Sequence, residues 1–300
     1  MTHIFLTRFP NKILAVKFNK TFLVVLLENM FCVYALHQMK KKLCNISIPP
    51  NPRSIFALAV EESSNMLVYP GSTHFGEVHI FDITQRKIKL FISAHNSIIA
   101  ALSINKTATK LATASDKGTV IRVFSTVDGK KLYEFRRGVA RYACVYSITF
   151  SPNSSFLAVS SNLETVHIFK LSEVVVEEGQ NRDRTWLTYF GKVGSDCLNK
   201  VMNVSTGYLP EQVKNLVSMD RAFATAKIHF SDFRNTCALT IIDKKLRLVV
   251  ASVGGLLYIF DFNLAEGGEC TLIQKHRLDE DIVTNSENIK SHNERKADWW

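Results

Sequence analysis

The chain has 300 residues, of which 46% are hydrophobic, so it can form one large domain or two ordinary ones. Its net charge of +10 favours an anionic partner such as nucleic acid, an anionic membrane surface or an acidic protein segment. The six cysteines are too widely spaced for zinc or redox motifs, and the longest apolar run, Phe22 to Leu27, is too short to cross a bilayer. Because the N-terminus also lacks the pattern of a secretory signal, we expect a cytoplasmic protein with free thiols.

One pattern recurs five times along the chain. Each copy has an alternating strand, a polar turn, a second apolar strand and a third strand that closes on an aromatic residue. The closing aromatics are Tyr34, Phe81, Phe124, Phe169 and Phe260, at spacings of 47, 43, 45 and 91 residues. Periods of about 40 to 50 residues with several short strands per copy are typical of WD-type propellers. The sequence therefore predicts an all-β, WD40-type β-propeller over residues 1–278, with five blades visible.

The last spacing is about twice the others, which predicts an insertion in one blade at about residues 172–217. The segment RAFATAKIHF after the insertion is expected to supply the fourth strand of that blade. Aromatic and apolar residues of the insertion include Trp186, Tyr189, Phe190, Tyr208 and Leu209. Such side chains either insert into a membrane surface or pack on the domain or a partner, and the sequence leaves both open. The polar tail, residues 279–300, is expected to be disordered.

The segment Phe135-Arg136-Arg137-Gly138 is the strongest functional signal in the chain. Two adjacent arginines on an extended strand point to opposite sides of it, so one short motif can serve two anion sites. A guanidinium group binds phosphate oxygens through two parallel hydrogen bonds and stays charged at any working pH. The alternative is that both arginines are surface residues paired with nearby acids such as Glu134.

This motif and its surroundings resemble the PROPPIN family, propellers that bind polyphosphoinositides, and within it the WIPI proteins of autophagy. The resemblance covers about Phe9 to Leu278. It is carried by Phe-Arg-Arg-Gly and by AHNSIIAALSINKTATKLATASDKGTVIRVFS, SSNLETVHIFKL, TWLTYFGKV, LPEQV, RAFATAKI and EGGEC…KHRL. It implies a seven-bladed propeller, of which the two N-terminal blades are not visible here. Either the chain is a shortened form, or its five blades make an open or differently closed arc with exposed strand edges.

The resemblance also implies two phosphoinositide headgroups at the rim, one on each side of the blade with the arginine pair. One site would use His95, Ser115, Thr119, Arg122 and Arg136, with Thr113 as a further candidate. The other would use Arg137, Ser161, Thr165 and His167. Arginines supply charge and hydroxyls donate hydrogen bonds, and histidines with an ordinary pKa of about 6.5 would strengthen binding at mildly acidic pH. The alternatives are that the hydroxyls cap their own backbone and that His95 is a structural histidine.

The implied function is that of a peripheral membrane adaptor in autophagosome formation. Its lipids would be phosphatidylinositol 3-phosphate and phosphatidylinositol 3,5-bisphosphate, at preautophagosomal structures or endosomes. Two weak headgroup sites and one inserting loop on the same surface would act through avidity. WIPI-like proteins also recruit an acidic coiled-coil autophagy protein through a basic groove. Lys20 and His37 would contribute to it here, at positions where the family can carry arginines.

The same sequence features also bear on other classes of function. A WD-repeat scaffold could use the arginine pair to bind acidic or phosphorylated peptides without lipid, and this alternative stays open. Nucleic-acid binding is disfavoured because the basic residues are scattered and no recognition motif is present. No nucleophile–base pair, metal-ligand cluster or phosphate-binding glycine loop stands out, so we expect neither an enzyme nor a cofactor.

Overall fold

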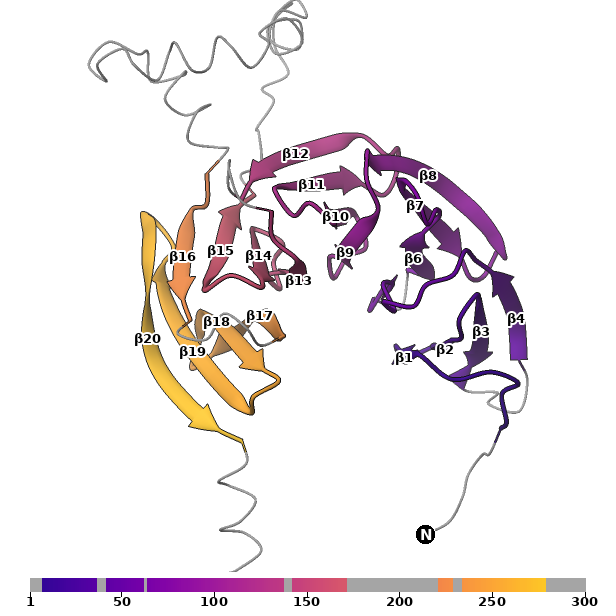
Figure 1. Ribbon diagram of the computed structural model, residues 1–300, viewed down its shortest axis with the longest axis horizontal. Helices are drawn as coiled ribbons and strands as arrows, with labels where there is room; N and C mark the ends of the chain where they lie inside the picture. The colour runs from indigo at the N-terminus through magenta and orange to yellow at the C-terminus, as the bar shows by residue number, and fades with distance from the viewer. Residues whose placement is uncertain are drawn as a thin grey trace, which may run out of the picture. The chain divides into compact units, whose positions relative to one another are not determined.

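The structure, a computed structural model, describes residues 7–36, 42–61, 64–137, 142–171, 221–228 and 234–278. These ranges contain twenty β-strands, β1 to β20 (Figure 1). No helix within them is long and apolar enough to cross a membrane. The strands form five four-stranded antiparallel units in chain order, called blades 1 to 5 below; blades 4 and 5 are joined into one eight-stranded sheet. The predicted all-β propeller class and its five visible blades are confirmed.

Every blade adds its strands in chain order, so that each strand pairs with the one before it. Blade 1 contains β1 (Ala15–Phe18), β2 (Phe22–Leu26), β3 (Met30–Ala35) and β4 (Lys42–Ser47). Blade 2 contains β5 (Ala57–Leu58), β6 (Met66–Pro70), β7 (Gly76–Asp82) and β8 (Lys87–His95). Blade 3 contains β9 (Ile99–Ile104), β10 (Lys110–Ser115), β11 (Val120–Ser125) and β12 (Lys131–Arg136). Blade 4 contains β13 (Val145–Phe150), β14 (Phe156–Ser161), β15 (Thr165–Lys170) and β16 (Ala224–Lys227). Blade 5 contains β17 (Asn235–Ile242), β18 (Lys245–Ser252), β19 (Leu256–Asn263) and β20 (Gly267–Arg277).

The aromatic residue that closes each copy of the sequence repeat lies on the third strand of its blade. In every blade it is paired with a leucine of the second strand. The pairs are Leu23–Tyr34, Leu67–Phe81, Leu111–Phe124, Leu157–Phe169 and Leu248–Phe260. Because directly opposite residues point to the same face of a sheet, each pair places two large apolar side chains side by side. The sequence repeat is therefore a repeat of cross-strand contacts.

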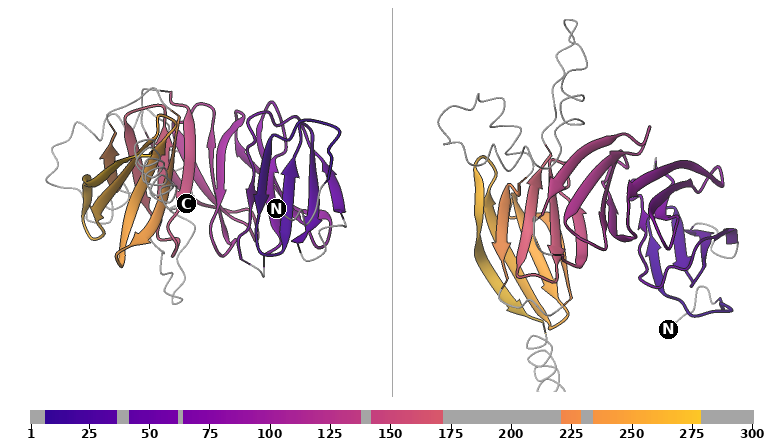
Figure 2. Two further views of the ribbon diagram at one scale, coloured as in Figure 1. Left: turned by 90° about the horizontal axis from the view of Figure 1, so that it is seen from below. Right: turned by 45° about the horizontal axis from the view of Figure 1, so that its top comes forward.

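Hydrophobic cores lie between neighbouring blades. Strand alternation directs one face of a sheet to the preceding blade and the other face to the following blade. Representative pairs across the four cores are Leu26 with Leu67, Ile80 with Leu111, Phe135 with Phe169 and Ile168 with Leu248. Figure 2 shows the blades following one another in the same order from two further sides. A site at the rim between two blades is thus held by the core beneath it.

Blades 4 and 5 are also joined by a parallel strand pair. Residues 224–227, inside the RAFATAKIHF segment, form β16, which pairs with β15 as predicted from the sequence. On its other side β16 pairs with β20, with Ala224 opposite Gly268. The adjacent Gly267 has φ +73°, and a Cβ atom there would lie 2.0 Å from the carbonyl oxygen of Phe223. A glycine is needed at this position both for the backbone conformation and for the close approach.

Several predicted segments lie outside the described residues. They are the insertion at about 172–217, with Trp186, Tyr189, Phe190, Tyr208 and Leu209, and the tail at 279–300. The described strands belong to one compact unit on both sides of segment 172–220. The roles of the insertion and of the tail stay predictions.

Candidate functional site

The arginine pair lies at the end of β12, the outermost strand of blade 3. Arg136 is the last residue of β12 and pairs with Val120 of β11, while Glu134 pairs with Arg122. Paired residues share a face, and so do residues two apart on one strand. Arg122, Glu134 and Arg136 therefore project from one face of blade 3. We call it the first face.

The opposite face of blade 3, the second face, carries the other arginine. Phe135 points to this face and stacks on Phe169 of blade 4, with 4.7 Å between the ring centroids. Arg137 follows Arg136 and continues the alternation toward blade 4. Arg136 is exposed, whereas Arg137 is only 8% exposed. The two adjacent arginines thus differ in both direction and environment.

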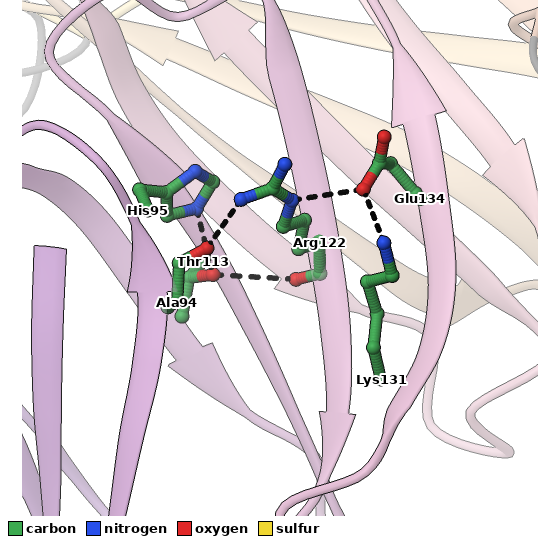
Figure 3. Close-up of polar contacts among 6 residues, drawn as sticks. All are labelled: Ala94, His95, Thr113, Arg122, Lys131 and Glu134. Atoms are coloured by element: carbon green, nitrogen blue, oxygen red, sulfur yellow. Dashed lines mark hydrogen bonds and ion pairs between the residues drawn. The ribbon is translucent and has the colours of Figure 1, made fainter. Parts of the chain in front are cut away.

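The first face holds a connected group of polar side chains (Figure 3). Arg122 donates from Nη1 to the carbonyl oxygen of Ala94 at 2.6 Å and from Nε to Oε2 of Glu134 at 2.9 Å. The same carboxylate oxygen accepts a hydrogen bond from Nζ of Lys131 at 2.7 Å. These contacts fix the guanidinium group of Arg122 between blade 2 and β12. Glu134, which the sequence offered as a partner of the arginine pair, contacts Arg122 and Lys131 instead.

Charge on the first face is positive overall. Burial alone would raise the pKa of Glu134, but the hydrogen bonds and charges of Lys131 and Arg122 outweigh burial and lower it. The Glu134 carboxylate is therefore ionised at neutral pH, and it is shared by two cations. Arg136 adds a third cation, and no described carboxylate forms an ion pair with it. An anion approaching Arg136 would meet a surplus of positive charge.

The remaining residues of the first face surround this group. Nε2 of His95, the last residue of β8, lies 3.0 Å from Oγ1 of the fully buried Thr113. Ser115 follows Thr113 by two residues on β10, so it points to the same face. Thr119 lies just before β11, and its carbonyl oxygen accepts the backbone amide of Arg137 at 2.9 Å. Four of the five residues predicted for the first site, His95, Ser115, Arg122 and Arg136, thus lie where blades 2 and 3 meet. Thr119 instead lies opposite Arg137, whose side chain projects to the second face.

The turn between β10 and β11 connects the two faces. Nε of Arg137 donates to the carbonyl oxygen of Gly118 at 2.8 Å, while the amide of Gly118 donates to the carbonyl of Ser115 at 3.0 Å. Gly118 has φ +60°, and a Cβ atom there would lie 1.8 Å from the carbonyl oxygen of Ala143. Any larger residue would displace the backbone that positions Arg137. Gly118 therefore permits the close backbone approach that positions Arg137.

The predicted partners of Arg137 come from blade 4. His167 and Thr165 precede Phe169 on β15 by two and four residues, so they share the face that stacks on Phe135 of blade 3. Ser161 is the last residue of β14, is 1% exposed, and its hydroxyl accepts the amide of Leu163 at 3.3 Å. Nδ1 of His167 is buried and has no hydrogen-bond partner among the described residues. A ligand oxygen beside Arg137 could supply that partner.

Both site histidines have depressed pKa values. Burial, followed by the charge of Arg122, lowers the pKa of His95 to about 4. Burial, followed by the charge of Arg137, lowers the pKa of His167 to about 4. The expectation of stronger binding at mildly acidic pH assumed an ordinary pKa of about 6.5 and needs correction: in the unliganded protein both rings stay neutral down to about pH 5. A neutral imidazole still donates one hydrogen bond.

Two further residues of the second face were not singled out from the sequence. Thr225 pairs with His167, and Lys227 pairs with Thr165, so both β16 side chains project beside the predicted site. Nζ of Lys227 lies 2.9 Å from Oε1 of Glu269, and both side chains are well exposed. The alternation in this segment indicates a strand. The sequence did not show which residues of this strand pair with β15, because the insertion separates the two strands.

The remaining predictions are only partly covered by the structure. Lys20 is exposed in the turn between β1 and β2, whereas His37 lies outside the described residues, so the basic groove stays a prediction. The described residues contain no group of three His, Cys, Asp or Glu side chains that could hold a metal ion.

Five four-stranded blades, with polar groups at the edges where blades meet, define a β-propeller of the WD type. The chain belongs to the PROPPIN family, whose model matches residues 2–279. Its fold is similar to that of Kluyveromyces lactis Hsv2, with a TM-score of 0.66 and 20% identity over 92% of this chain and 77% of that one. A structure titled "Complex of KlAtg21 with coiled-coil of AgAtg16" gives a TM-score of 0.66 and 20% identity over 90% of this chain and 72% of that one.

Curated relatives are more similar in sequence. The chain is 45% identical over 283 residues to WD repeat domain phosphoinositide-interacting protein 2 of Mus musculus, a match that covers 94% of this chain and 62% of the relative. It is 44% identical over 270 residues to WD repeat domain phosphoinositide-interacting protein 1 of Homo sapiens, covering 90% and 58%. Autophagy-related protein 18 of Caenorhabditis elegans is 36% identical over 274 residues, covering 90% and 65%. The chain thus spans roughly three fifths of the length of these relatives.

Proposed function

We propose that this protein is a phosphoinositide-binding adaptor that is recruited to membranes through two headgroup sites on the two faces of blade 3. The observation that carries the proposal is the placement of Arg136 and Arg137. Adjacent in sequence, they project to opposite faces. The face of Arg136 also carries Arg122 and Thr113, which contact the end of β8 in blade 2, and Arg137 lies near enough to His167 of blade 4 to lower its pKa. Family membership and the names of the curated relatives support the choice of lipid.

Each face offers the groups that a phosphorylated inositol requires. On the first face, Arg136 is the accessible cation, and Arg122, held by Ala94 and Glu134, is a positioned one. On the second face, Arg137 supplies charge and Nδ1 of His167 supplies a buried, unsatisfied polar atom among the described residues. Charge-assisted hydrogen bonds of guanidinium to phosphate are among the stronger polar contacts in proteins. Hydroxyl groups then distinguish an inositol ring from inorganic phosphate.

Membrane recruitment by these sites would be cooperative. A basic residue near an anionic membrane contributes only about 1 kcal/mol, so diffuse charge does not give lipid selectivity. Two weak headgroup sites on one surface raise each other's effective concentration. We assign the same role to the insertion at about 172–217, whose aromatic residues would enter the bilayer surface. The specific lipids in the proposal are phosphatidylinositol 3-phosphate and the 3,5-bisphosphate.

The proposal places the protein in autophagosome formation, peripherally on preautophagosomal or endosomal membranes, without a catalytic step. One relative is named an autophagy-related protein, and one solved propeller of the same fold is titled as a complex with a coiled coil. We therefore propose an acidic coiled-coil protein as a second partner of this chain. Its binding would involve Lys20 and His37 in a basic groove.

Liposome flotation tests the lipid sites. Folded native protein is expected to float with vesicles that contain phosphatidylinositol 3-phosphate or the 3,5-bisphosphate and to stay in solution with vesicles of neutral lipid alone. The double variant Arg136→Thr/Arg137→Thr should lose flotation because both cations are removed. A variant that loses two exposed charges of β8, Lys87→Thr/Lys89→Thr, is the matched control and should float like the native chain.

Two outcomes would overturn the proposal. One is a folded native protein that does not bind these lipids. The other is an equal loss of flotation in the control, since this would indicate general charge attraction rather than two defined sites. Binding of acidic or phosphorylated peptides in the absence of membranes would then favour a protein-interaction scaffold.

A further inference from the structure

A cavity of about 630 Å³ lies along the first strands of the blades, apart from the arginine pair on the outermost strand of blade 3. Its lining comes from β1, from residues 53–56 before β5, from β9 and β13, and from the facing ends of β17 and β18. Pockets that bind small molecules typically have volumes of about 300 to 1,000 Å³. The cavity is therefore large enough for a small organic ligand.

The charges on the cavity wall have one sign. Lys17, Arg53 and Arg234 line it, and no aspartate or glutamate is among the described residues of the lining. Arg53 and Arg234 are exposed, and neither forms an ion pair with a described residue. Three cations facing one space without a carboxylate repel each other unless an anion enters.

Hydrogen-bonding groups accompany these cations. Nζ of Lys17 donates to the carbonyl oxygen of Phe56 and lies 4.7 Å from the centroid of the Phe56 ring, so its position is fixed. Oγ1 of Thr236 and Oγ of Ser147 lie 3.3 Å apart on β17 and β13. Such hydroxyls can turn toward ligand oxygens, and an ammonium that is held in place loses less entropy on binding.

We infer that this cavity binds a small, soluble organic polyphosphate, such as a multiply phosphorylated polyol, at a site separate from the two membrane headgroup sites. A polyphosphate matches three cations with several charges in a volume of this size. The lining joins the first strands of blades 1, 3, 4 and 5 with the segment before the first strand of blade 2, which gives such a ligand a second effect. It would hold the blades together, because a ligand that binds only the folded state stabilises that state.

The inference can be separated from the lipid sites by using the full chain with Arg136→Thr/Arg137→Thr. Arg136 and Arg137 are absent from this background, and remaining binding of inositol hexakisphosphate is measured by titration calorimetry. The part of this binding that depends on Arg53 and Arg234 belongs to the cavity. Replacing Arg53 and Arg234 by glutamine in this background should weaken binding by about tenfold or more, as expected for loss of charge-assisted hydrogen bonds. The matched variant Lys87→Gln/Lys89→Gln should change it by less than about twofold.

Absence of binding in the Arg136→Thr/Arg137→Thr background would overturn the inference, and so would equal weakening by the cavity and β8 variants. A hexaglutamate peptide that binds where inositol hexakisphosphate does not would also overturn it and indicate a protein partner. Absence of polyphosphate binding in the cavity would leave the expected flotation of the native chain unchanged. Conversely, loss of flotation in Arg136→Thr/Arg137→Thr does not depend on the cavity.

A second measurement uses the exposed Cys144, which lines the cavity, and needs no change in the cavity wall. Saturating inositol hexakisphosphate should slow alkylation of Cys144, followed by mass spectrometry, by about tenfold. Cys44, half-buried on β4 and outside the cavity, is the internal control and should react at an unchanged rate. An unchanged rate at Cys144 under saturating ligand would contradict occupancy of the cavity.

Discussion

Arg137 shows what is required to keep a charge in a nearly buried place. Its side chain is 8% exposed, and burial lowers the pKa of its guanidinium group from the usual value. Nε donates to the carbonyl oxygen of Gly118, so part of the lost hydration is replaced. Arginine tolerates this environment because its ordinary pKa lies far above neutral pH. The same charge helps to keep the neighbouring His167 neutral.

The two site histidines should make stability depend on pH. The pKa of each ring is about 4 in the folded protein, against about 6.5 in an unfolded chain. Between pH 6.5 and 4 the unfolded state therefore binds more protons, so stability falls as the pH falls through this window and is fully present above it. The loss is on the order of 2 to 3 kcal/mol for each histidine by pH 4. Thermal melting across this range should show a steep decrease in Tm.

Histidine variants test the origin of that decrease. His95→Gln/His167→Gln removes both groups and should flatten the dependence of Tm on pH between 6.5 and 4. The variant His276→Gln changes an exposed histidine of β20 and should keep the native profile. An equally steep profile in the His95/His167 variant would mean that other groups cause the acid sensitivity.

At the scale of elements, the contact of β20 with β16 depends on two neighbouring glycines with different surroundings. Gly267 has φ +73° and no space for a Cβ atom, which would meet the carbonyl oxygen of Phe223. Gly268 has φ +93°, but nothing lies within 4 Å of the position of its Cβ. The amide of Gly268 donates to the same Phe223 carbonyl at 2.9 Å, which fixes the start of β20 against β16.

Alanine at these two positions should therefore have different effects. Gly268→Ala should lower the free energy of unfolding only by the cost of placing alanine in a left-handed backbone conformation, about 1 to 2 kcal/mol. Gly267→Ala also introduces a steric clash with the backbone. We therefore expect it to lower the free energy of unfolding by roughly 3 kcal/mol or more in total. Thermal or urea unfolding of the two variants measures the difference. Equal decreases in the free energy of unfolding would show that the close approach to Phe223 does not make Gly267→Ala more destabilising.

The strands could be predicted from the sequence where local chemistry repeats. The closing aromatics predicted the third strand of every blade, because each occupies the same cross-strand position opposite a leucine. The parallel pairing of β16 with β20 could not be predicted, since it depends on contact between segments that are distant in sequence. For the same reason the positions of Thr225 and Lys227 beside the second face were missed.

At the scale of the whole molecule, each proposed headgroup site needs two blades. The first face combines His95 of blade 2 with Arg122 and Arg136 of blade 3, and the second combines Arg137 of blade 3 with His167 of blade 4. The hydrophobic cores between these blades therefore control the geometry of both sites. Residue types and alternation in the sequence predicted the direction of both arginines. The low pKa values of His95 and His167 and the contact of Glu134 with Arg122 could be found only from the packed structure.

The most direct test of two separate sites is the number of headgroups bound per protein chain. A soluble short-chain phosphatidylinositol 3-phosphate can be titrated into the native chain, with calorimetry giving the stoichiometry. We expect two headgroups for the native protein, one for folded Arg136→Thr, one for folded Arg137→Thr and none for the double variant. One headgroup bound by the native chain, or loss of all binding in either single variant, would contradict the proposal of two separate sites.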